Sequence, residues 1–111
     1  MKIHRALGPG LLESAYEECL HDELLKAGLL VERQKPLPLI YEEVKKEIDY
    51  RVDLLVERCV VVEVEAVEGI SDAHRAQLIT YLKLSGCKLG LLINFHVALL
   101  TDGIQRLVYH L

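Results

Sequence analysis

The chain has 111 residues, 51% of them hydrophobic, and its 13 basic and 17 acidic side chains give a formal net charge of −4. This length predicts one domain, spanning residues 1–111, with a single core. The acidic balance and a pI near 5.7 lack the basic patch that is usual for nucleic-acid-binding proteins. This argues against tight, unassisted binding to DNA or RNA.

Composition also bears on location and assembly. No stretch approaches the roughly 20 apolar residues of a membrane helix. The N-terminal apolar run is interrupted at residues 8–10, so neither a membrane span nor a signal peptide is predicted. Cys19, Cys59 and Cys87 lack metal-binding spacing and are interpreted as reduced, which favours a cytoplasmic protein. Because the chain is rather apolar for its size, we expect a homodimer.

The first predicted helix begins after Gly8-Pro9-Gly10 and ends near residue 27, where Gly28 stops it. Two acids one turn apart, Glu13 and Glu17, share one face of this helix with Tyr16. An acidic first turn that complements the helix dipole explains them without any ligand. The expected apolar stripe of the helix is formed by Leu12, Ala15, Cys19, Leu20 and Leu24.

Strand-forming residues dominate the next part of the chain. Short strands are predicted at 31–34 and 39–44, separated by Lys35-Pro36-Leu37-Pro38, because proline is excluded from central strand positions. A hairpin then runs from about residue 47 to 67, with its turn at Glu57-Arg58-Cys59. The pattern predicts that these elements form one sheet.

The hairpin gathers charged side chains on one face. Its turn places Asp53 opposite Glu63, and Glu65 across from Arg51, because strand side chains alternate between faces. The polar face would hold Asp49, Arg51, Asp53, Glu63 and Glu65, and the apolar face Ile48, Tyr50, Val52, Leu54, Val56, Val60, Val62, Val64 and Ala66.

Opposed carboxylates destabilise a strand pair, and at about 4 Å they repel by roughly 4 kcal/mol at an effective dielectric near 20. A hard divalent cation such as Mg²⁺ or Mn²⁺ would neutralise them, as would Arg51 or a raised pKa. The alternative interpretation is a fully solvated acidic face that binds nothing.

A second helix is predicted from about Asp72 to Leu84, with Ser71 as its N-cap and Gly86 as its end. Its polar stripe of His74, Gln77 and Tyr81 suits either a phosphate or nucleobase ligand or plain solvent. Its core candidates are Ala73, Ala76, Ile79 and Leu82. Strands at 88–94 and 104–109 complete an α/β or α+β domain, a sheet with helices packed on it.

Several fragments together resemble the GxxExxY proteins, a small prokaryotic family in the PD-(D/E)xK nuclease-like superfamily. The resemblance covers nearly the whole chain, and its strength lies in the order and spacing of the fragments. They are Gly10-Leu-Leu-Glu13-Ser-Ala-Tyr16, Gln34, Pro36, Tyr41, Arg51-Val-Asp53-Leu-Leu-Val-Glu57, Val61-Val-Glu63, Ala66-Val-Glu68, Gln77-Leu-Ile-Thr-Tyr81-Leu-Lys83, Leu92-Ile-Asn94-Phe95 and Gly103-Ile-x-Arg106.

The resemblance implies a restriction-endonuclease-like core, a mixed sheet with the carboxylate-bearing hairpin at its centre and two flanking helices. It implies a divalent-metal site, Mg²⁺ or Mn²⁺, at Asp53 and Glu63, with Glu13 as the helix acid that joins them. Gln77 and Tyr81 are similar to a Gln-x-x-x-Tyr pair that would orient the substrate. The implied activity is metal-assisted phosphodiester hydrolysis on nucleic acid.

One position departs from the family pattern, which ends Glu-x-Lys, because Glu65 stands where the lysine is expected. Arg51 across the hairpin supplies the missing charge, or a helix residue such as Lys83 reaches in, or the site is inactive. The expected catalytic set is therefore Asp53, Glu63, Glu65 and Arg51. The rival functions are an inactive nuclease-like module that binds nucleic acid or a partner protein, and a structural dimer without a ligand.

Overall fold

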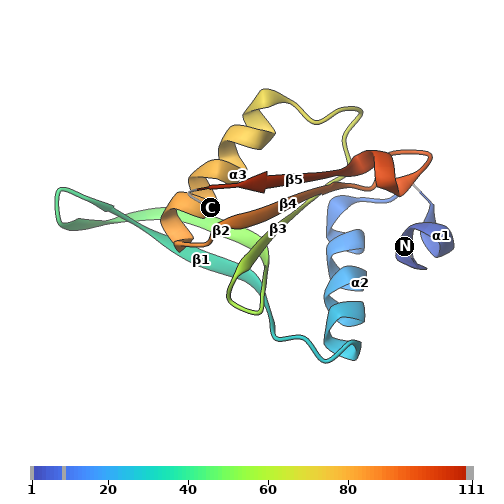
Figure 1. Cartoon of the computed structure of the whole chain (residues 1–111), viewed down its shortest axis with the longest axis horizontal. Helices are drawn as coiled ribbons and strands as arrows, with labels where there is room; N and C mark the ends of the chain where they lie inside the picture. Colours follow the sequence, from blue (N-terminus) through green and yellow to red (C-terminus); the bar gives the residue numbers. More distant parts are fainter. Residues whose placement is uncertain (1, 9, 110–111) are drawn as a thin grey trace.

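A computed structural model describes residues 2–8 and 10–109, without the side chains of residues 40, 41 and 45–49. The predicted positions of Ile48 and Asp49 therefore lie outside the described side chains. The elements, shown in Figure 1, are α1 (Lys2–Leu7), α2 (Glu13–Lys26), β1 (Val31–Tyr41), β2 (Val44–Val56), β3 (Val60–Glu65), α3 (Asp72–Ser85), β4 (Leu89–Asn94), the 3-10 helix η1 (Leu100–Gly103) and β5 (Ile104–Val108).

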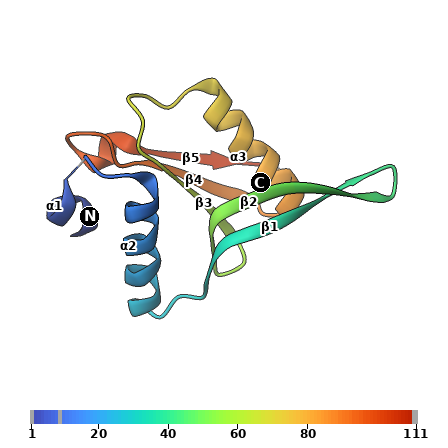
Figure 2. The same cartoon turned by 180° about the vertical axis from the view of Figure 1, so that it is seen from behind.

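The five strands form one mixed sheet in the order β1-β2-β3-β4-β5. Neighbouring strands are antiparallel except β3 and β4, which are parallel. A parallel pair needs a long crossover, and α3 provides it. Helices α2 and α3 pack on opposite sides of the sheet, and the β1–β2 hairpin extends away from the body (Figures 1 and 2). The mixed α+β architecture predicted from the sequence is confirmed, and it is that of a restriction-endonuclease-like fold.

The β2–β3 hairpin turns where the sequence predicts, with Val56 paired to Val60. The prediction of one apolar and one polar face is wrong, however. Leu54 and Val62 belong to the core under α2, whereas Leu55 and Val61 belong to the core under α3. Because helices cover both sides, both faces of this hairpin are largely apolar. The same holds for Val52, which lies in the α3 core instead of beside Leu54.

The prolines at 36 and 38 do not interrupt β1, contrary to the prediction of two short strands. β1 is an edge strand of the sheet, so one side of it makes no ladder hydrogen bonds that proline would remove. The pairing of β1 with β2 shifts register between Leu37 and Leu39, which accommodates the second proline.

Helix α2 ends as predicted, with Gly28 at a φ of 83°. Three residues of the expected apolar stripe, Cys19, Leu20 and Leu24, belong to or pack against the core, but Leu12 does not. Leu12 is 79% exposed, whereas Tyr16, Glu17 and Leu20 are buried. The Tyr16 ring stacks on Phe95 at the end of β4, with 4.4 Å between ring centroids. This contact turns the Tyr16 and Glu17 side of the helix toward the sheet.

Helix α3 has the predicted caps, Ser71 at its N-terminus and Gly86 in the left-handed conformation after it. Its buried residues are Leu78, Tyr81 and Leu82, whereas Ala73 and Ala76 are exposed and are not the core positions expected. The side chain of Asn94 fastens the segment after β3 to the end of β4, because it bonds both the carbonyl and the N–H of Val67.

Within the described ranges, no helix has the length and apolar character required to cross a membrane.

Candidate functional site

Asp53 and Glu63 lie where β2 and β3 separate. The paired residues of the two strands end at Leu54 and Val62, and side chains replace the backbone ladder beyond them. The N–H of Asp53 donates to Glu63 Oε2 at 2.8 Å, and the N–H of Val64 donates to Asp53 Oδ2 at 2.8 Å. Each carboxylate is thereby fixed by the neighbouring strand with one oxygen. The predicted opposition of Asp53 and Glu63 is confirmed.

Burial makes this acidic pair costly to ionise. Glu63 is 5% exposed, and desolvation, followed by repulsion from Asp53, raises its pKa to about 9. Desolvation also raises the pKa of Asp53 to about 6, against the lowering effect of the Val64 N–H and with a further increase from Glu17. Two acids that each resist ionisation form a region of strong negative potential whenever both are charged.

Glu17 of α2, not Glu13, is the helix acid beside Asp53. It is 6% exposed and accepts hydrogen bonds from Arg33 Nε at 2.7 Å and Gln34 Nε2 at 2.7 Å. Gln34 also donates to Asp53 Oδ1 at 3.2 Å, so its amide bridges the helix and the strand. The sequence singled out Glu17 only as part of an acidic turn, and it gave Arg33 and Gln34 no role in bringing that turn to the sheet.

The backbone of Gln34 lies in the left-handed region, with a φ of 53°. A residue with a Cβ rarely adopts this conformation, which costs on the order of 1 kcal/mol or more and persists where the surroundings enforce it. Here the conformation turns the Gln34 amide toward the two acids. The spacing of residues in the sequence contains no signal for this.

Two further acids, Glu65 at the end of β3 and Glu13 of α2, lie beside each other near the pair of Asp53 and Glu63. Glu65 is half-buried, and desolvation followed by repulsion from Glu13 raises its pKa to about 7. Glu13 is exposed at the start of α2. The basic group next to Glu65 is His74 of α3, whose Nε2 lies 4.0 Å from Glu65 Oε2.

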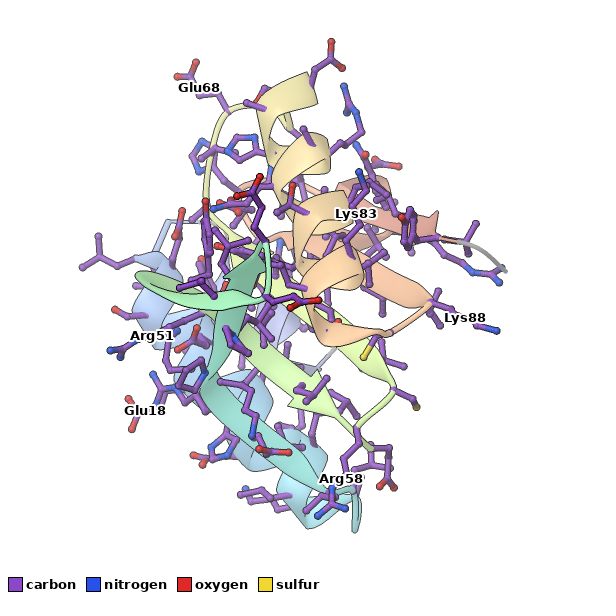
Figure 3. All side chains as sticks on the ribbon, turned by 90° about the vertical axis from the view of Figure 1, so that its left-hand side faces the viewer. Glu18, Arg51, Arg58, Glu68, Lys83 and Lys88 are labelled. Carbon is purple, nitrogen blue, oxygen red and sulfur yellow. The ribbon has the colours of Figure 1, made fainter. Side chains whose placement is uncertain are left out.

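The two cations expected to compensate Glu65 lie elsewhere. Arg51 pairs with Pro36 of β1, and the β2–β3 pairing that would have set it opposite Glu65 stops at Leu54. Figure 3 shows Arg51 on the side of Glu18, across the view from Lys83. The Lys83 ammonium lies over the Tyr109 ring, 5.7 Å from its centroid, on the side of α3 that faces away from Arg51.

Gln77 and Tyr81 lie on the α3 stripe that was predicted to orient a substrate. Gln77 Nε2 donates to the Tyr81 hydroxyl at 2.9 Å. Desolvation raises the pKa of Tyr81, and the negative charges of Glu63 and Asp53 raise it further, so its hydroxyl lies close to the acidic pair. The helix therefore presents polar groups above the acids, with Tyr81 toward Glu63 and His74 toward Glu65.

The carboxylates of this site provide some of the oxygen ligands that a hard divalent cation requires. Among the side chains that the structure describes, no group of three or more His, Cys, Asp or Glu is arranged to hold a metal ion. The predicted trio of Glu13, Asp53 and Glu63 is not such a group here, and Glu13 lies beside Glu65. The pair of Asp53 and Glu63 fits Mg²⁺ or Mn²⁺ chemistry by itself, since Mg²⁺ commonly binds through one or two carboxylates and keeps several waters.

A mixed sheet that carries paired acids at a strand junction, between helices on both faces, is the architecture of nuclease-like domains. The family model described as the PD-(D/E)XK nuclease superfamily matches residues 1–107, and the chain belongs to this superfamily. Enzymes of this superfamily usually use divalent metals. Comparisons with curated proteins and with solved structures gave no significant match.

Proposed function

We propose that this domain binds one divalent cation, Mg²⁺ or Mn²⁺, through Asp53 and Glu63 and hydrolyses phosphodiester bonds slowly. The observation that carries the proposal is the reciprocal fixation of the two acids. Each carboxylate uses one oxygen on the backbone of the other strand. Glu63 keeps Oε1 for a cation, and Asp53 would offer Oδ1, which also accepts the Gln34 amide at 3.2 Å. A bound divalent cation would supply a water of lowered pKa and polarise the phosphate.

The protein's own groups would position the substrate around this pair. Tyr81 and Gln77 offer a hydroxyl and an amide from α3, donors suited to phosphate oxygens. Glu17 and Gln34 hold Asp53 from the opposite side. Superfamily membership supports this function, and the motif from Gly10 to Tyr16 supports the finer assignment to the GxxExxY proteins.

The second candidate is an inactive nuclease-like module that binds nucleic acid or a partner protein. Glu65 favours it, because an acid replaces the lysine of the signature at a half-buried position. A missing electrostatic contact of this kind costs on the order of 10²- to 10³-fold in rate. The net charge of −4 also disfavours tight unassisted binding of nucleic acid, although a bound cation would offset part of the local field.

Calorimetric titration with Mn²⁺ tests the metal site directly. We expect one saturable site per chain in the wild type and none in Asp53→Asn, with the fold checked by circular dichroism. Glu57→Gln, in the exposed hairpin turn, is the matched control and should bind as the wild type does. A wild type that binds no Mn²⁺ at millimolar concentration contradicts the proposal. So does an Asp53→Asn protein that binds normally.

A further inference from the structure

Hydrogen bonds at the start of α3 determine which nitrogen of the His74 imidazole carries the proton. The backbone N–H of Ser71 donates to His74 Nδ1 at 2.9 Å, and Ser71 Oγ lies 3.0 Å from the same nitrogen. Nδ1 is therefore an acceptor, and the proton of a neutral ring is on Nε2. Because the N–H of His74 also bonds Ser71 Oγ at 3.2 Å, the capping box fixes the placement of the ring.

The protonated nitrogen is the one that faces Glu65. Nε2 lies 4.0 Å from Glu65 Oε2, so a small side-chain movement brings the N–H into hydrogen-bond range. Both side chains are largely shielded, with 26% of His74 and 14% of Glu65 exposed. An interaction between partly buried groups is screened less by water and salt than one on the open surface.

We infer that His74 is a positioning residue that compensates Glu65, in the role expected of Arg51 or Lys83. Its Nε2–H holds the Glu65 carboxylate toward α3 and offsets the negative charge that this residue adds beside Glu63. The inference rests on the proposed metal site at Asp53 and Glu63. It makes His74 a determinant of cation affinity, acting through Glu65, without being a metal ligand.

The side-chain chemistry of α3 permits a matched set of variants. In His74→Asn, the amide oxygen takes the place of Nδ1 and still accepts the Ser71 N–H, but the side chain is too short to reach Glu65. In His74→Gln, the amide N–H reaches the position of Nε2, and glutamine at this position of the capping box can still accept the Ser71 N–H. Both variants therefore retain the capping interaction and differ in the contact with Glu65. His21→Asn on α2 controls for loss of an imidazole elsewhere.

Calorimetric titration with Mn²⁺ at pH 8, above the pKa of about 7 to which burial raises Glu65, measures the effect. We expect His74→Asn to bind Mn²⁺ about threefold or more tightly than the wild type, because the charge of Glu65 is no longer offset. His74→Gln and His21→Asn should bind as the wild type does. Glu65→Gln should bind more weakly, and adding His74→Asn to Glu65→Gln should change nothing further.

The coupling between the two positions decides the inference. Equal Mn²⁺ affinities for wild type and His74→Asn overturn it, as does an effect of His74→Asn that persists in the Glu65→Gln background. A wild type that binds no Mn²⁺ overturns the proposed function together with the inference.

Imidazole ¹⁵N spectra of the metal-free wild type give a measurement that does not depend on variant folding. They should show an unprotonated Nδ1, and a Nε2 resonance that shifts in Glu65→Gln but not in Glu57→Gln. A protonated Nδ1 contradicts the inference.

Discussion

Asp53 and Glu63 place two carboxyl groups in a poorly hydrated junction of the sheet. The free-energy cost of burying them depends on pH, because only their ionised forms are strongly disfavoured there. Burial raises the pKa of Glu63 to about 9 and that of Asp53 to about 6. Above the ordinary carboxyl pKa, the unfolded chain has lost protons that the folded protein still holds. The free energy of unfolding of the metal-free protein therefore falls as pH rises from about 4.5 toward 9.

Glu63→Gln should flatten this pH dependence. The amide oxygen can still accept the Asp53 N–H, while the group no longer ionises. In EDTA at pH 8, we expect the variant to be more stable than the wild type by about 1.4 kcal/mol or more, the equivalent of one pKa unit. Urea unfolding at pH 5 and pH 8 provides the measurement. A wild type whose stability rises over this range shows that the acids are not held protonated.

We predict that Glu65 limits the activity of the proposed site. Replacing it with lysine restores the cation of the signature, so Glu65→Lys should raise Mn²⁺- or Mg²⁺-dependent cleavage of a mixed DNA and RNA panel by about 10²-fold or more. Glu65→Gln, which removes only the negative charge, should have a smaller effect. Absence of cleavage by both the wild type and Glu65→Lys, with metal bound to each, favours the inactive binding module.

The elements hold the acids through a few close contacts between segments. At the end of β4, Gly103 of η1 approaches the backbone so closely that an added Cβ would lie 2.1 Å from the carbonyl oxygen of Asn94. Asn94 in turn bonds Val67, in the segment that follows Glu65. The packing of β4 against η1 therefore supports the strand end that carries the acids.

Gly103→Ala should destabilise the protein by about 1–3 kcal/mol, since the backbone must move to accommodate the methyl group. Gly69→Ala is the matched control, because a Cβ there meets no atom within 4 Å. Thermal melts of the two variants, compared with the wild type, measure the difference. Equal melting temperatures would show that η1 moves aside without cost.

At the scale of the whole molecule, the sheet leaves apolar surface uncovered. The edge strand β5 exposes 39% of Ile104 and 45% of Val108. A groove of about 290 Å³ lies between α2 and the sheet and is lined by Leu20, Leu24, Val56, Val60, Val62, Leu91 and Ile93. These features agree with the apolar composition that suggested a homodimer.

We predict a homodimer in solution that buries about 1,200 Å² or more in total, the range of specific interfaces. Light scattering from micromolar to hundred-micromolar concentrations should give twice the chain mass of 12.6 kDa. Val108→Lys on the sheet edge should shift the equilibrium toward monomer if β5 takes part. A monomer mass throughout the concentration range rules the dimer out.

Local patterns in the sequence determined the two long helices, the end of α2 before Gly28, both caps of α3, the turn at 57–59, and the opposition of Asp53 and Glu63. These features follow from alternation, glycine conformations and capping chemistry, which act over a few residues. Only the tertiary structure placed Glu17 beside Asp53 and His74 beside Glu65. It also placed Arg51 and Lys83 away from Glu65, because the separation of β2 from β3 and the rotation of each helix depend on packing between distant segments. The position of β1 at the sheet edge was likewise decided by strand order, which proline spacing does not encode.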